Sequence, residues 1–246
     1  MININNLKYK YPNGHHAIND LSMAVSRGER IGIIGANGAG KSTLLHLILG
    51  LYQYQSGEII IDQTLINSDN IKKSLNQIGM VFQNPDHQLF MNTVFEDVAF
   101  GPFNEGLSHE IIEKRVDEAL GEVGIMHLKD HSTFKLSGGE KRAVAIATVL
   151  SMKPKIILMD EPASNLDAKT RRRLINLIKR LPQTMLITSH DLDFIFESTG
   201  RVMVMAHGRI IHFGNTQALL SNREMLEKCG LELPMRLQGC PICSKI

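Results

Sequence analysis

The segment from residue 30 to residue 42 reads Arg30-Ile31-Gly32-Ile33-Ile34-Gly35-Ala36-Asn37-Gly38-Ala39-Gly40-Lys41-Ser42. Its first five residues are rich in β-branched side chains and favour a buried strand, and the glycines that follow favour a tight loop. After Lys41, five apolar residues predict a helix, and Gly50 stands where a left-handed cap would end it: Leu44, Leu45, Leu47, Ile48 and Leu49. The predicted order is therefore strand, glycine loop, helix.

The glycine loop matches the pattern G-x-x-x-x-G-K-[ST] of phosphate-binding loops. In such loops backbone N–H groups surround the phosphates, the lysine reaches the β- and γ-phosphates, and the serine hydroxyl meets Mg²⁺. A glycine-rich turn without a ligand is the alternative, but the strand before the loop and the helix after it favour a phosphate site. We therefore expect Lys41 and Ser42 to bind phosphate and Mg²⁺.

Further along the chain, buried strands are predicted at residues 156–159 and 184–188, with helical stretches at residues 143–152 and 169–180. Strands that alternate with helices indicate an α/β fold with a parallel sheet covered on both faces. Two features do not fit this alternation. Segments 58–62, 201–206 and 210–213 predict an extra antiparallel β layer, and residues 108–121 predict a helix in a separate helical subdomain.

Composition narrows the class of protein. Of the 246 residues, 43% are hydrophobic and 21% are charged, so the chain can bury a core. The formal net charge of +2 argues against a nucleic-acid partner, and the run Arg171-Arg172-Arg173 is typical of a solvated helix face. No run of apolar residues is long enough to span a bilayer, so we expect a cytoplasmic protein unless a partner recruits it.

The three cysteines lie near the C-terminus, at Cys229, Cys240 and Cys243. Their placement implies no disulfide framework and a reducing compartment. Cys240 and Cys243 form a C-x-x-C pair, which supplies two of the four ligands that a closed metal site needs. A loosely ordered thiol tail and a metal or redox site both remain open.

Two carboxylates, Asp160 and Glu161, follow the predicted strand at residues 156–159. Ligands of open α/β sheets bind beyond the carboxyl ends of strands, so Asp160 is placed to hold Mg²⁺ through its water shell. Glu161 is placed to orient and polarise an attacking water. On its own the pair would more often be a solvated strand end, but the upstream phosphate loop favours the catalytic interpretation.

Ser137, Gly138 and Gly139 open the helical stretch that continues through residues 143–152. A helix N-terminus carries partial positive charge and attracts anions, so this segment is a candidate second phosphate site. The alternative is an ordinary helix-capping turn.

In this order and spacing the motifs resemble those of the ABC ATPase family, over nearly the whole chain to about Phe213. The resemblance makes residues 35–43, ending in Thr43, the Walker A motif, residues 136–140 the signature and residues 156–161 Walker B. It implies a P-loop NTPase (RecA-like) parallel-sheet core with an antiparallel β subdomain and an α-helical subdomain. It also implies ATP hydrolysis by two chains arranged head to tail, each ATP held between Walker A of one and the signature of the other.

The same resemblance assigns four further elements. Tyr11 stacks on adenine, with Tyr9 as a neighbouring candidate. Gln83 is the Q-loop glutamine, a catalytic residue with Glu161 and His190 and a ligand of Mg²⁺ with Ser42 and Asp160. Residues 164–167 form the D-loop, and His190 contacts the γ-phosphate. The signature ends in Glu140 where glutamine is commoner in the family.

Residues 82–90 and 96–102 are similar to those of energy-coupling factor importers, particularly the cobalt and nickel subgroup, although His87 stands where those relatives usually carry a second aspartate. This likeness implies a peripheral ATPase subunit on the cytoplasmic face of the membrane that powers uptake of cobalt, nickel or a vitamin. Its partners would be a second ATPase subunit, identical or related, a transmembrane coupling subunit and a substrate-binding membrane subunit.

Residues 89–91 would then dock the coupling subunit, or else pack in the core. A soluble ABC ATPase of iron–sulfur assembly or DNA metabolism is the alternative function. We expect a nucleotide-binding domain at residues 1–225, with a helical subdomain at about 84–152, and a tail at residues 226–246.

Overall fold

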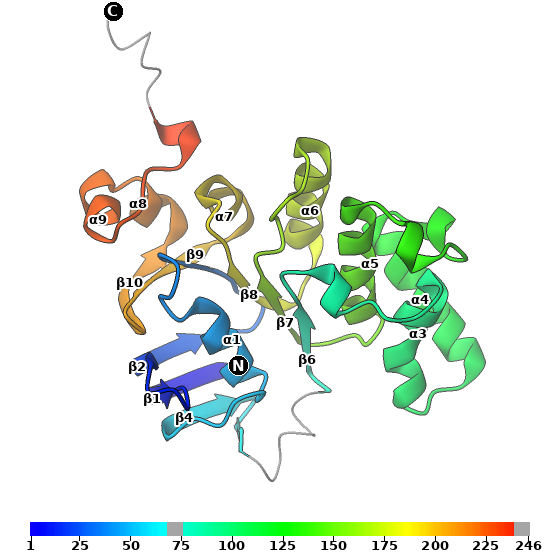
Figure 1. Ribbon diagram of the computed structural model, residues 1–246, viewed down its shortest axis with the longest axis horizontal. Coiled ribbons are helices and arrows are strands. Elements are labelled where there is room, and N and C mark those ends of the chain that lie inside the picture. The colour runs from blue at the N-terminus through cyan, green and yellow to red at the C-terminus, as the bar shows by residue number, and fades with distance from the viewer. Residues whose placement is uncertain (68–75, 239–246) are drawn as a thin grey trace, which may run out of the picture. The chain divides into compact units, whose positions relative to one another are not determined.

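The computed structural model describes residues 1–67 and 76–238 (Figure 1). Cys240 and Cys243 of the C-x-x-C pair lie outside the described residues. The chain divides into two compact units, one formed by Met1–Ser74 with Thr184–Ile246 and the other by Leu75–Gln183. Neither unit contains, within the described residues, a helix long and apolar enough to cross a bilayer.

The first unit contains an antiparallel sheet in the order β2-β1-β4-β5. Its strands are β1 (Ile2–Lys10), β2 (His16–Val25), β4 (Ser56–Ile61) and β5 (Thr64–Leu65). Strand β1 buries alternate residues, but the alternation shifts at Asn6, which has a φ of 47° where the register with β2 is broken. This bulge turns Leu7 inward again, so that both halves of the strand face the core.

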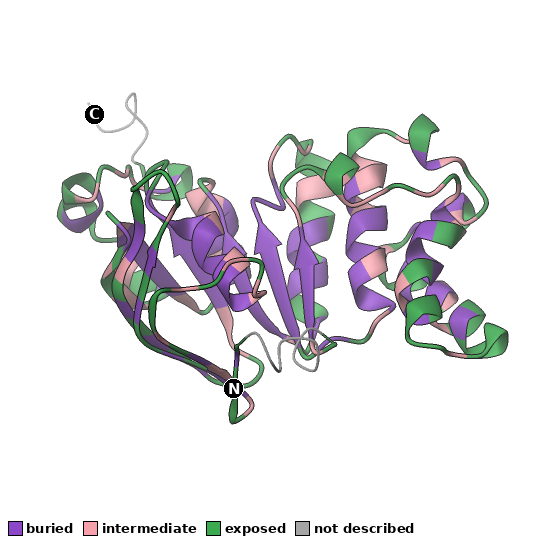
Figure 2. Ribbon diagram, turned by 60° about the horizontal axis from the view of Figure 1, so that its bottom comes forward, coloured by how far each residue is buried: buried purple, intermediate pink, exposed green. Residues whose placement is uncertain are grey.

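The same unit also holds four strands in the order β10-β9-β3-β8. Strand β3 (Arg30–Ile34) runs parallel to both β8 (Thr184–Thr188) and β9 (Arg201–Ala206), while β10 (Arg209–Asn215) is antiparallel to β9. The β9–β10 turn places His207 and Gly208 at positive φ, as expected for a two-residue hairpin loop. Figure 2 shows the parallel strands of each unit as buried, which explains their continuous apolar sequences.

The prediction of an extra β layer was therefore right for only one of its segments. Strand β4, which contains residues 58–61 of the predicted segment, lies in the antiparallel sheet. Residues 201–206 and 210–213 form the predicted antiparallel pair, but they extend the sheet that contains β3. The reason is burial on both faces. Val202, Met203, Val204 and Met205 are all buried, and such a strand requires neighbours and cover on each side.

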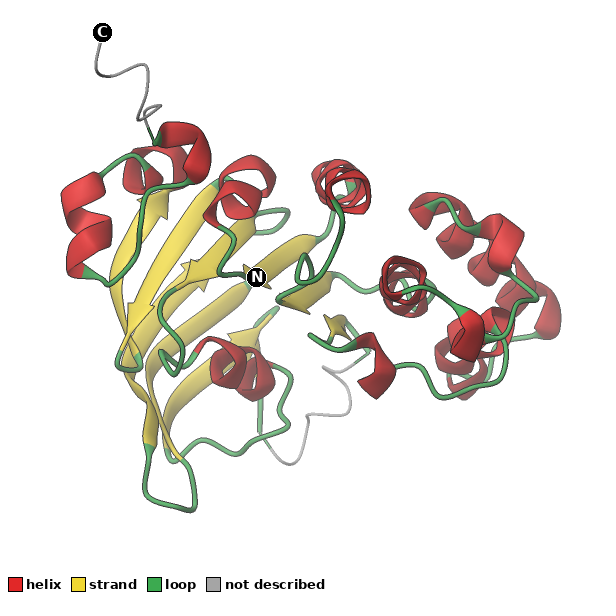
Figure 3. Ribbon diagram, turned by 45° about the horizontal axis from the view of Figure 1, so that its top comes forward, coloured by secondary structure: helices red, strands yellow, loops and turns green. Residues whose placement is uncertain are grey.

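Helices cover this sheet on two faces (Figure 3). Helix α1 (Lys41–Ile48) lies on one face, and α7 (Leu192–Ser198), α8 (Thr216–Leu220) and α9 (Arg223–Lys228) lie on the other. A short 3-10 turn, η4 (Met235–Leu237), follows α9 and returns to α7. The predicted helix after the glycine loop is confirmed, and Gly50 has the expected positive φ of 74°.

The second unit pairs β6 (Ile78–Val81) with β7 (Ile156–Asp160) in parallel. Its helices are α3 (Val94–Asn104), α4 (His109–Val123), α5 (Gly138–Leu150) and α6 (Ala168–Arg180), with the 3-10 turns η1 (Pro85–His87), η2 (Met126–Leu128) and η3 (Thr133–Lys135). Helices α3, α4 and α5 pack on one another around fully buried Val98, Val116 and Val144. Helix α4 confirms the helix expected at residues 108–121, and the subdomain boundaries stay a prediction.

Candidate active site

The phosphate loop connects β3 to α1 in the first unit. Gly35 and Gly40 both have positive φ, and a Cβ at these positions would collide with the carbonyl oxygens of Met205 and Ala17 respectively. Only glycine is compatible with this backbone path. The buried Lys41 amine turns back on the loop and donates hydrogen bonds to the carbonyl oxygens of Gly35, at 2.8 Å, and Ala36, at 3.2 Å.

Tyr11 is joined to the same loop by its hydroxyl, which lies 2.8 Å from Oγ1 of Thr43. Its ring makes an edge-on contact with Tyr9, with ring centroids 5.0 Å apart, and Tyr9 stacks on Tyr52. Tyr9 is buried, and burial with the neighbouring Tyr11 and Tyr52 raises its pKa. Tyr11 is less buried than Tyr9, and its assignment to adenine stays a prediction.

His190 comes to the edge of the sheet where the phosphate loop begins. Strands β3 and β8 are parallel, with Ile33 opposite Thr188, and the N–H of Ser189 donates to the carbonyl of Ile33 at 3.2 Å. His190 is therefore presented, exposed, beyond the carboxyl end of β8. The next residue, Asp191, caps α7 by accepting a hydrogen bond from the N–H of Phe194 at 2.8 Å.

In the second unit the parallel pair of strands brings together Gln83, Asp160 and Glu161. Val81 lies opposite Met159, so the residues after β6 and those at the end of β7 leave the sheet at one edge. Asp160 and Glu161 are both buried, whereas Gln83 is exposed. Glu161 has a φ of 46°, a left-handed backbone conformation that is unusual for this residue type.

Ser137 begins α5 as its N-cap, and its hydroxyl accepts a hydrogen bond from the N–H of Glu140. The Glu140 carboxylate in turn accepts from the N–H of Ser137 at 2.8 Å and from its hydroxyl at 2.7 Å. These two hydrogen bonds lower the pKa of Glu140. The glutamate that departs from the family pattern thus completes a capping box, and the helix N-terminus predicted at the signature is confirmed.

Arg142 is a residue that the sequence interpretation missed. Its side chain is 4% exposed, and its guanidinium donates to the backbone carbonyls of Phe82, at 2.6 Å, and Gln83, at 2.5 Å. Burial lowers the pKa of Arg142. The only signal in the sequence was an arginine on the apolar side of a helix, next to Val144, Ala145 and Ile146.

Two more contacts fasten the segment after β6 to α5. The Gln88 amide donates to the carbonyl of Ala145 at 2.7 Å, and the Lys141 amine lies 2.6 Å from the Asp86 carboxylate. Together with Arg142 they hold the Q-loop segment along the helix that Ser137 begins. Within the second unit, side-chain contacts therefore join the Q-loop segment to the helix that begins at the signature.

The D-loop ends at Asp167, which caps α6 by accepting hydrogen bonds from the N–H groups of Lys169 and Thr170. The hydrogen bonds with Thr170 lower the pKa of Asp167. A cavity of about 220 Å³ lies between α5 and α6, and Ser137, Gly139 and Asp167 are among its lining residues.

Cys229, the one cysteine within the described residues, is half-buried. It lines a cavity of about 480 Å³ with Asn37, Gly38 and Lys228. Among the described residues no group of three side chains is arranged to hold a metal ion through His, Cys, Asp or Glu. A metal site at the thiol tail stays untested, since Cys240 and Cys243 lie outside this part of the chain.

The ABC transporter family profile matches residues 18–164, more than half of the chain. This chain belongs to the ABC transporter family. The predicted fold class is thereby confirmed, and the chain is an ABC-type ATP hydrolase whose turnover is coupled to transport.

Individual relatives of this ABC ATPase cover almost its entire length. The energy-coupling factor transporter ATP-binding protein EcfA of Methanothermobacter thermautotrophicus is 42% identical over 95% of this chain and 77% of its own. The structure of cbiO1 from Clostridium perfringens, described as part of the ABC transporter complex cbiONQ, has a TM-score of 0.85 and 39% identity over 100% of this chain and 98% of its own. The resemblance to the energy-coupling factor type is confirmed.

A third relative of this ABC ATPase has been solved with bound product. The ATP-binding cassette MJ0796, in a dimeric post-hydrolysis state with ADP and Pi, has a TM-score of 0.80 and 28% identity over 88% of this chain and 99% of its own. A nucleotide is therefore the ligand that this fold binds. The roles of the individual residues stay predictions.

Proposed function

We propose that this ABC ATPase is the ATP-binding and hydrolysing subunit of an energy-coupling factor importer that powers uptake of cobalt, nickel or a vitamin. The main support is the likeness to cbiO1, which extends over both chains from end to end. The EcfA relative is also named as an ATP-binding protein of an energy-coupling factor transporter. Selectivity for the cargo resides in a separate membrane-embedded subunit.

The phosphate chain of ATP binds the loop from Gly35 to Thr43. Its backbone N–H groups take the phosphates, and the Lys41 amine exchanges the loop carbonyls for phosphate oxygens, which are stronger, charged acceptors. Adenine stacks on Tyr11, whose hydroxyl contact with Thr43 holds the ring against the loop.

Mg²⁺ is the proposed metal cofactor, with Ser42, Gln83 and Asp160 as its protein ligands. The donor set fits, because Mg²⁺ prefers hydroxyl, amide and carboxylate oxygens and keeps several of its waters. Ser42 lies in the first turn of α1, and Asp160 is buried at the end of β7. When bound, the ion neutralises charge on the transferred phosphoryl group.

Hydrolysis requires that an attacking water be positioned and that developing charge be stabilised. Glu161 orients and polarises this water, and its left-handed backbone is the kind of strained conformation that clusters at active sites. His190 contacts the γ-phosphate, and Gln83 is the third catalytic residue, acting as a ligand of Mg²⁺. Ser137, Gly138 and Gly139 of a second ATPase subunit, identical or related, close the other side of the ATP at their helix N-terminus.

The transmembrane coupling subunit docks on an aromatic patch of the second unit. Phe90 and Phe103 are 59% and 70% exposed, and Phe90 contacts Phe100 edge-on with ring centroids 4.9 Å apart. The buried Asp97 carboxylate accepts hydrogen bonds from the N–H groups of Phe90 and Met91, which holds this turn in shape. Docking there places the ATPase on the cytoplasmic face of the membrane.

The test compares ATP turnover with cargo uptake. In cells that rely on this chain, Lys41→Ala should abolish uptake of radiolabelled cobalt, nickel or a vitamin, and the purified variant should not hydrolyse Mg-ATP. Uptake of all three that continues unchanged, while the purified variant has lost turnover, would refute the importer and leave the ATPase standing.

A further inference from the structure

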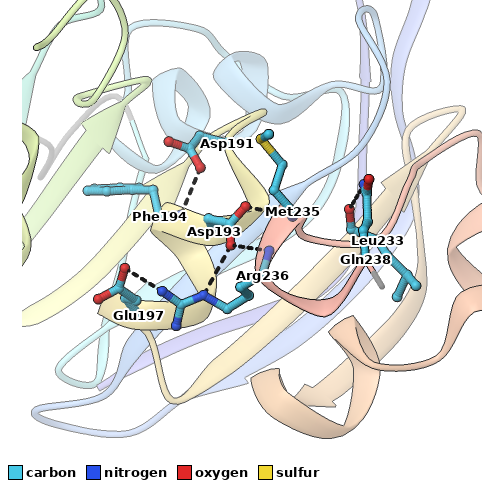
Figure 4. Close-up of polar contacts among 8 residues, drawn as sticks. All are labelled: Asp191, Asp193, Phe194, Glu197, Leu233, Met235, Arg236 and Gln238. Atoms are coloured by element: carbon cyan, nitrogen blue, oxygen red, sulfur yellow. Dashed lines mark hydrogen bonds and ion pairs between the residues drawn. The ribbon is translucent and has the colours of Figure 1, made fainter. Parts of the chain in front are cut away.

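The C-terminal turn η4 is fastened to α7, the helix that follows His190 (Figure 4). One carboxylate, that of Asp193, receives three hydrogen bonds. Its Oδ2 accepts from the N–H of Met235 at 2.7 Å, and its Oδ1 accepts from the backbone N–H of Arg236 at 3.2 Å and from its Nε at 3.0 Å. Both the backbone and the side chain of the turn are thus held.

Arg236 extends the contact by one helical turn. Its guanidinium donates to the Glu197 carboxylate at 2.7 Å and lies over the Phe196 ring, 5.2 Å from the centroid. Asp193 and Glu197 are four residues apart and therefore lie on the same side of α7. The Asp193 and Glu197 side chains are 20% and 11% exposed and that of Arg236 is 38% exposed, so the carboxylates are largely shielded from water while the guanidinium stays partly in contact with it.

The turn is also closed on itself. The Gln238 amide donates to the carbonyl of Leu233 at 2.7 Å, as Figure 4 shows. The turn therefore meets α7 as a preformed unit, and Arg236 bridges two carboxylates with a planar group suited to such contacts. We call this set of contacts, from Asp193 and Glu197 to Met235 and Arg236, the tail clamp.

Helix α7 needs such support because it is short. It has seven residues, of which Phe194, Ile195 and Ser198 are buried, and isolated helices of this length are unstable in water. Ile195 presses against β3 at Gly32, where a Cβ would collide with its Cγ2 atom. The position of α7 is thus set by the sheet on one side and by the tail clamp on another.

His190 stands at the N-terminal end of this helix. The Asp191 side chain caps α7, and the N–H of Asp191 donates to the Ser189 hydroxyl at 3.1 Å. His190 lies between the two residues that make this contact, so a tilt of α7 would move the backbone on both sides of it. Misplacing a catalytic group by about 1 Å can cost two orders of magnitude in rate.

We infer that the tail clamp positions α7, and through it His190, so that Arg236 is a positioning residue for ATP hydrolysis. The inference rests on the proposed role of His190. It gives a role in ATP hydrolysis to Met235 and Arg236, two residues that lie outside the nucleotide-binding motifs.

The experiment is a double-mutant cycle on the full chain. Arg236→Met should lower kcat about tenfold and leave KM for ATP within about twofold, because the phosphate loop is unaltered. Arg236→Lys, which keeps the charge, should recover most of the turnover. Arg223→Met is the matched control on neighbouring α9, since Arg223 has no ion pair among the described residues, and it should retain normal kcat.

The decisive arm combines Arg236→Met with His190→Ala. If the clamp acts through His190, the double variant should turn over no more slowly than His190→Ala alone. Asp193→Asn, which weakens the clamp from the other side, should reproduce the fall in kcat, and thermal melting verifies that each variant is folded.

The outcomes separate the two proposals. Unchanged turnover in His190→Ala would refute the role of His190 and the inference with it. Suppose that kcat falls in His190→Ala. If Arg236→Met then leaves kcat unchanged, or if the two substitutions lower kcat additively, the tail clamp is overturned as a positioning device and the proposed function stays intact. A folded Arg236→Met that shows a higher KM and a normal kcat would overturn it as well.

Discussion

Arg142 on α5 donates a hydrogen bond to the backbone carbonyl of Gln83, and so the helix that begins at the signature serine holds the Q-loop. The Arg142 side chain is buried, and burial disfavours the charged guanidinium and lowers its pKa. A buried arginine needs acceptors for its N–H groups, and the carbonyl of Phe82 accepts a second hydrogen bond from Arg142. Two motifs that are 54 residues apart in sequence, at Gln83 and Ser137, thereby share one side-chain link.

Arg142→Met should destabilise the chain by about 1 to 3 kcal/mol, since two part-buried carbonyl oxygens would lose a charged donor. Urea unfolding measures the change. The matched control is the neighbouring Lys141→Met, which removes only a mostly exposed ion pair with Asp86 and should cost below about 1 kcal/mol. Equal effects of the two variants would contradict the structural role of Arg142.

Glu140→Gln should reduce stability in a pH-dependent manner. Hydrogen bonds from Ser137 lower the pKa of Glu140 in the folded chain, so the folded state binds its proton less tightly than the unfolded state. The stabilisation is therefore present above the unfolded pKa and is lost as the pH falls through the folded pKa. Acid unfolding should show the stabilities of wild type and variant converging only as the pH falls through the folded pKa of Glu140, which lies below its ordinary value. A constant difference at every pH would contradict this account.

Asp97 should make the stability of the chain depend on pH in the opposite direction to Glu140. Burial raises the pKa of Asp97 despite the hydrogen bonds from Phe90 and Met91, and within the described residues its Oδ2 has no partner. The folded chain holds that proton more tightly, so stability declines as the pH rises from the unfolded to the folded pKa.

Asp97→Asn keeps an acceptor for the two N–H groups and should remove this decline. Asp97→Ala should lose about 1 to 3 kcal/mol, because both N–H groups lose their partner. Unfolding measured between pH 4 and pH 8 distinguishes the variants. If the stability of Asp97→Asn still declines as the pH rises, the decline belongs to another titrating group.

The two tyrosines near the phosphate loop can be separated by nucleotide affinity. If adenine stacks on Tyr11, then Tyr11→Ala should weaken ATP binding about tenfold, as loss of one base–aromatic stack does. Tyr11→Phe keeps the ring and loses only the Thr43 contact, so its Kd should change less than about fivefold. Calorimetric titration with ATP measures both. A larger effect of Tyr9→Ala than of Tyr11→Ala, in folded protein, would transfer the role to Tyr9.

Phe90→Glu should abolish cargo uptake and leave the ATPase activity of the purified chain near normal. Phe90 is mostly exposed, so a charge there costs little in folding but opposes an apolar partner surface. Ile111→Glu, at an exposed apolar residue on α4, is the matched control and should retain uptake. Loss of folding in Phe90→Glu would refute the docking role.

The parts of the fold that the sequence predicted well are those with strong local signals. The strand, loop and helix around Lys41 and the buried strands β7 and β8 combine continuous apolar runs with clear punctuation by glycine or proline. Strand β1 was missed because the bulge at Asn6 breaks its alternation of buried and exposed residues. The pairing of β9 with β3 was missed because strand order depends on tertiary contacts that no short pattern encodes.

The site residues also divide into those with a local sequence signal and those that only tertiary contacts reveal. The motif residues occupy strand ends and helix starts, positions that the sequence marks. Arg142 and Arg236 carry no such mark, because a basic residue on a helix or in a tail is usually solvated, and only the contacts reveal what each one holds.

The carbonyl partners of Lys41 have a consequence for nucleotide exchange. Because the amine finds two acceptors within its own loop, departure of ADP and phosphate does not strand a buried positive charge. Since Gly35 and Gly40 also set the backbone path of the loop, we expect the phosphate cradle to keep its shape between turnovers without refolding.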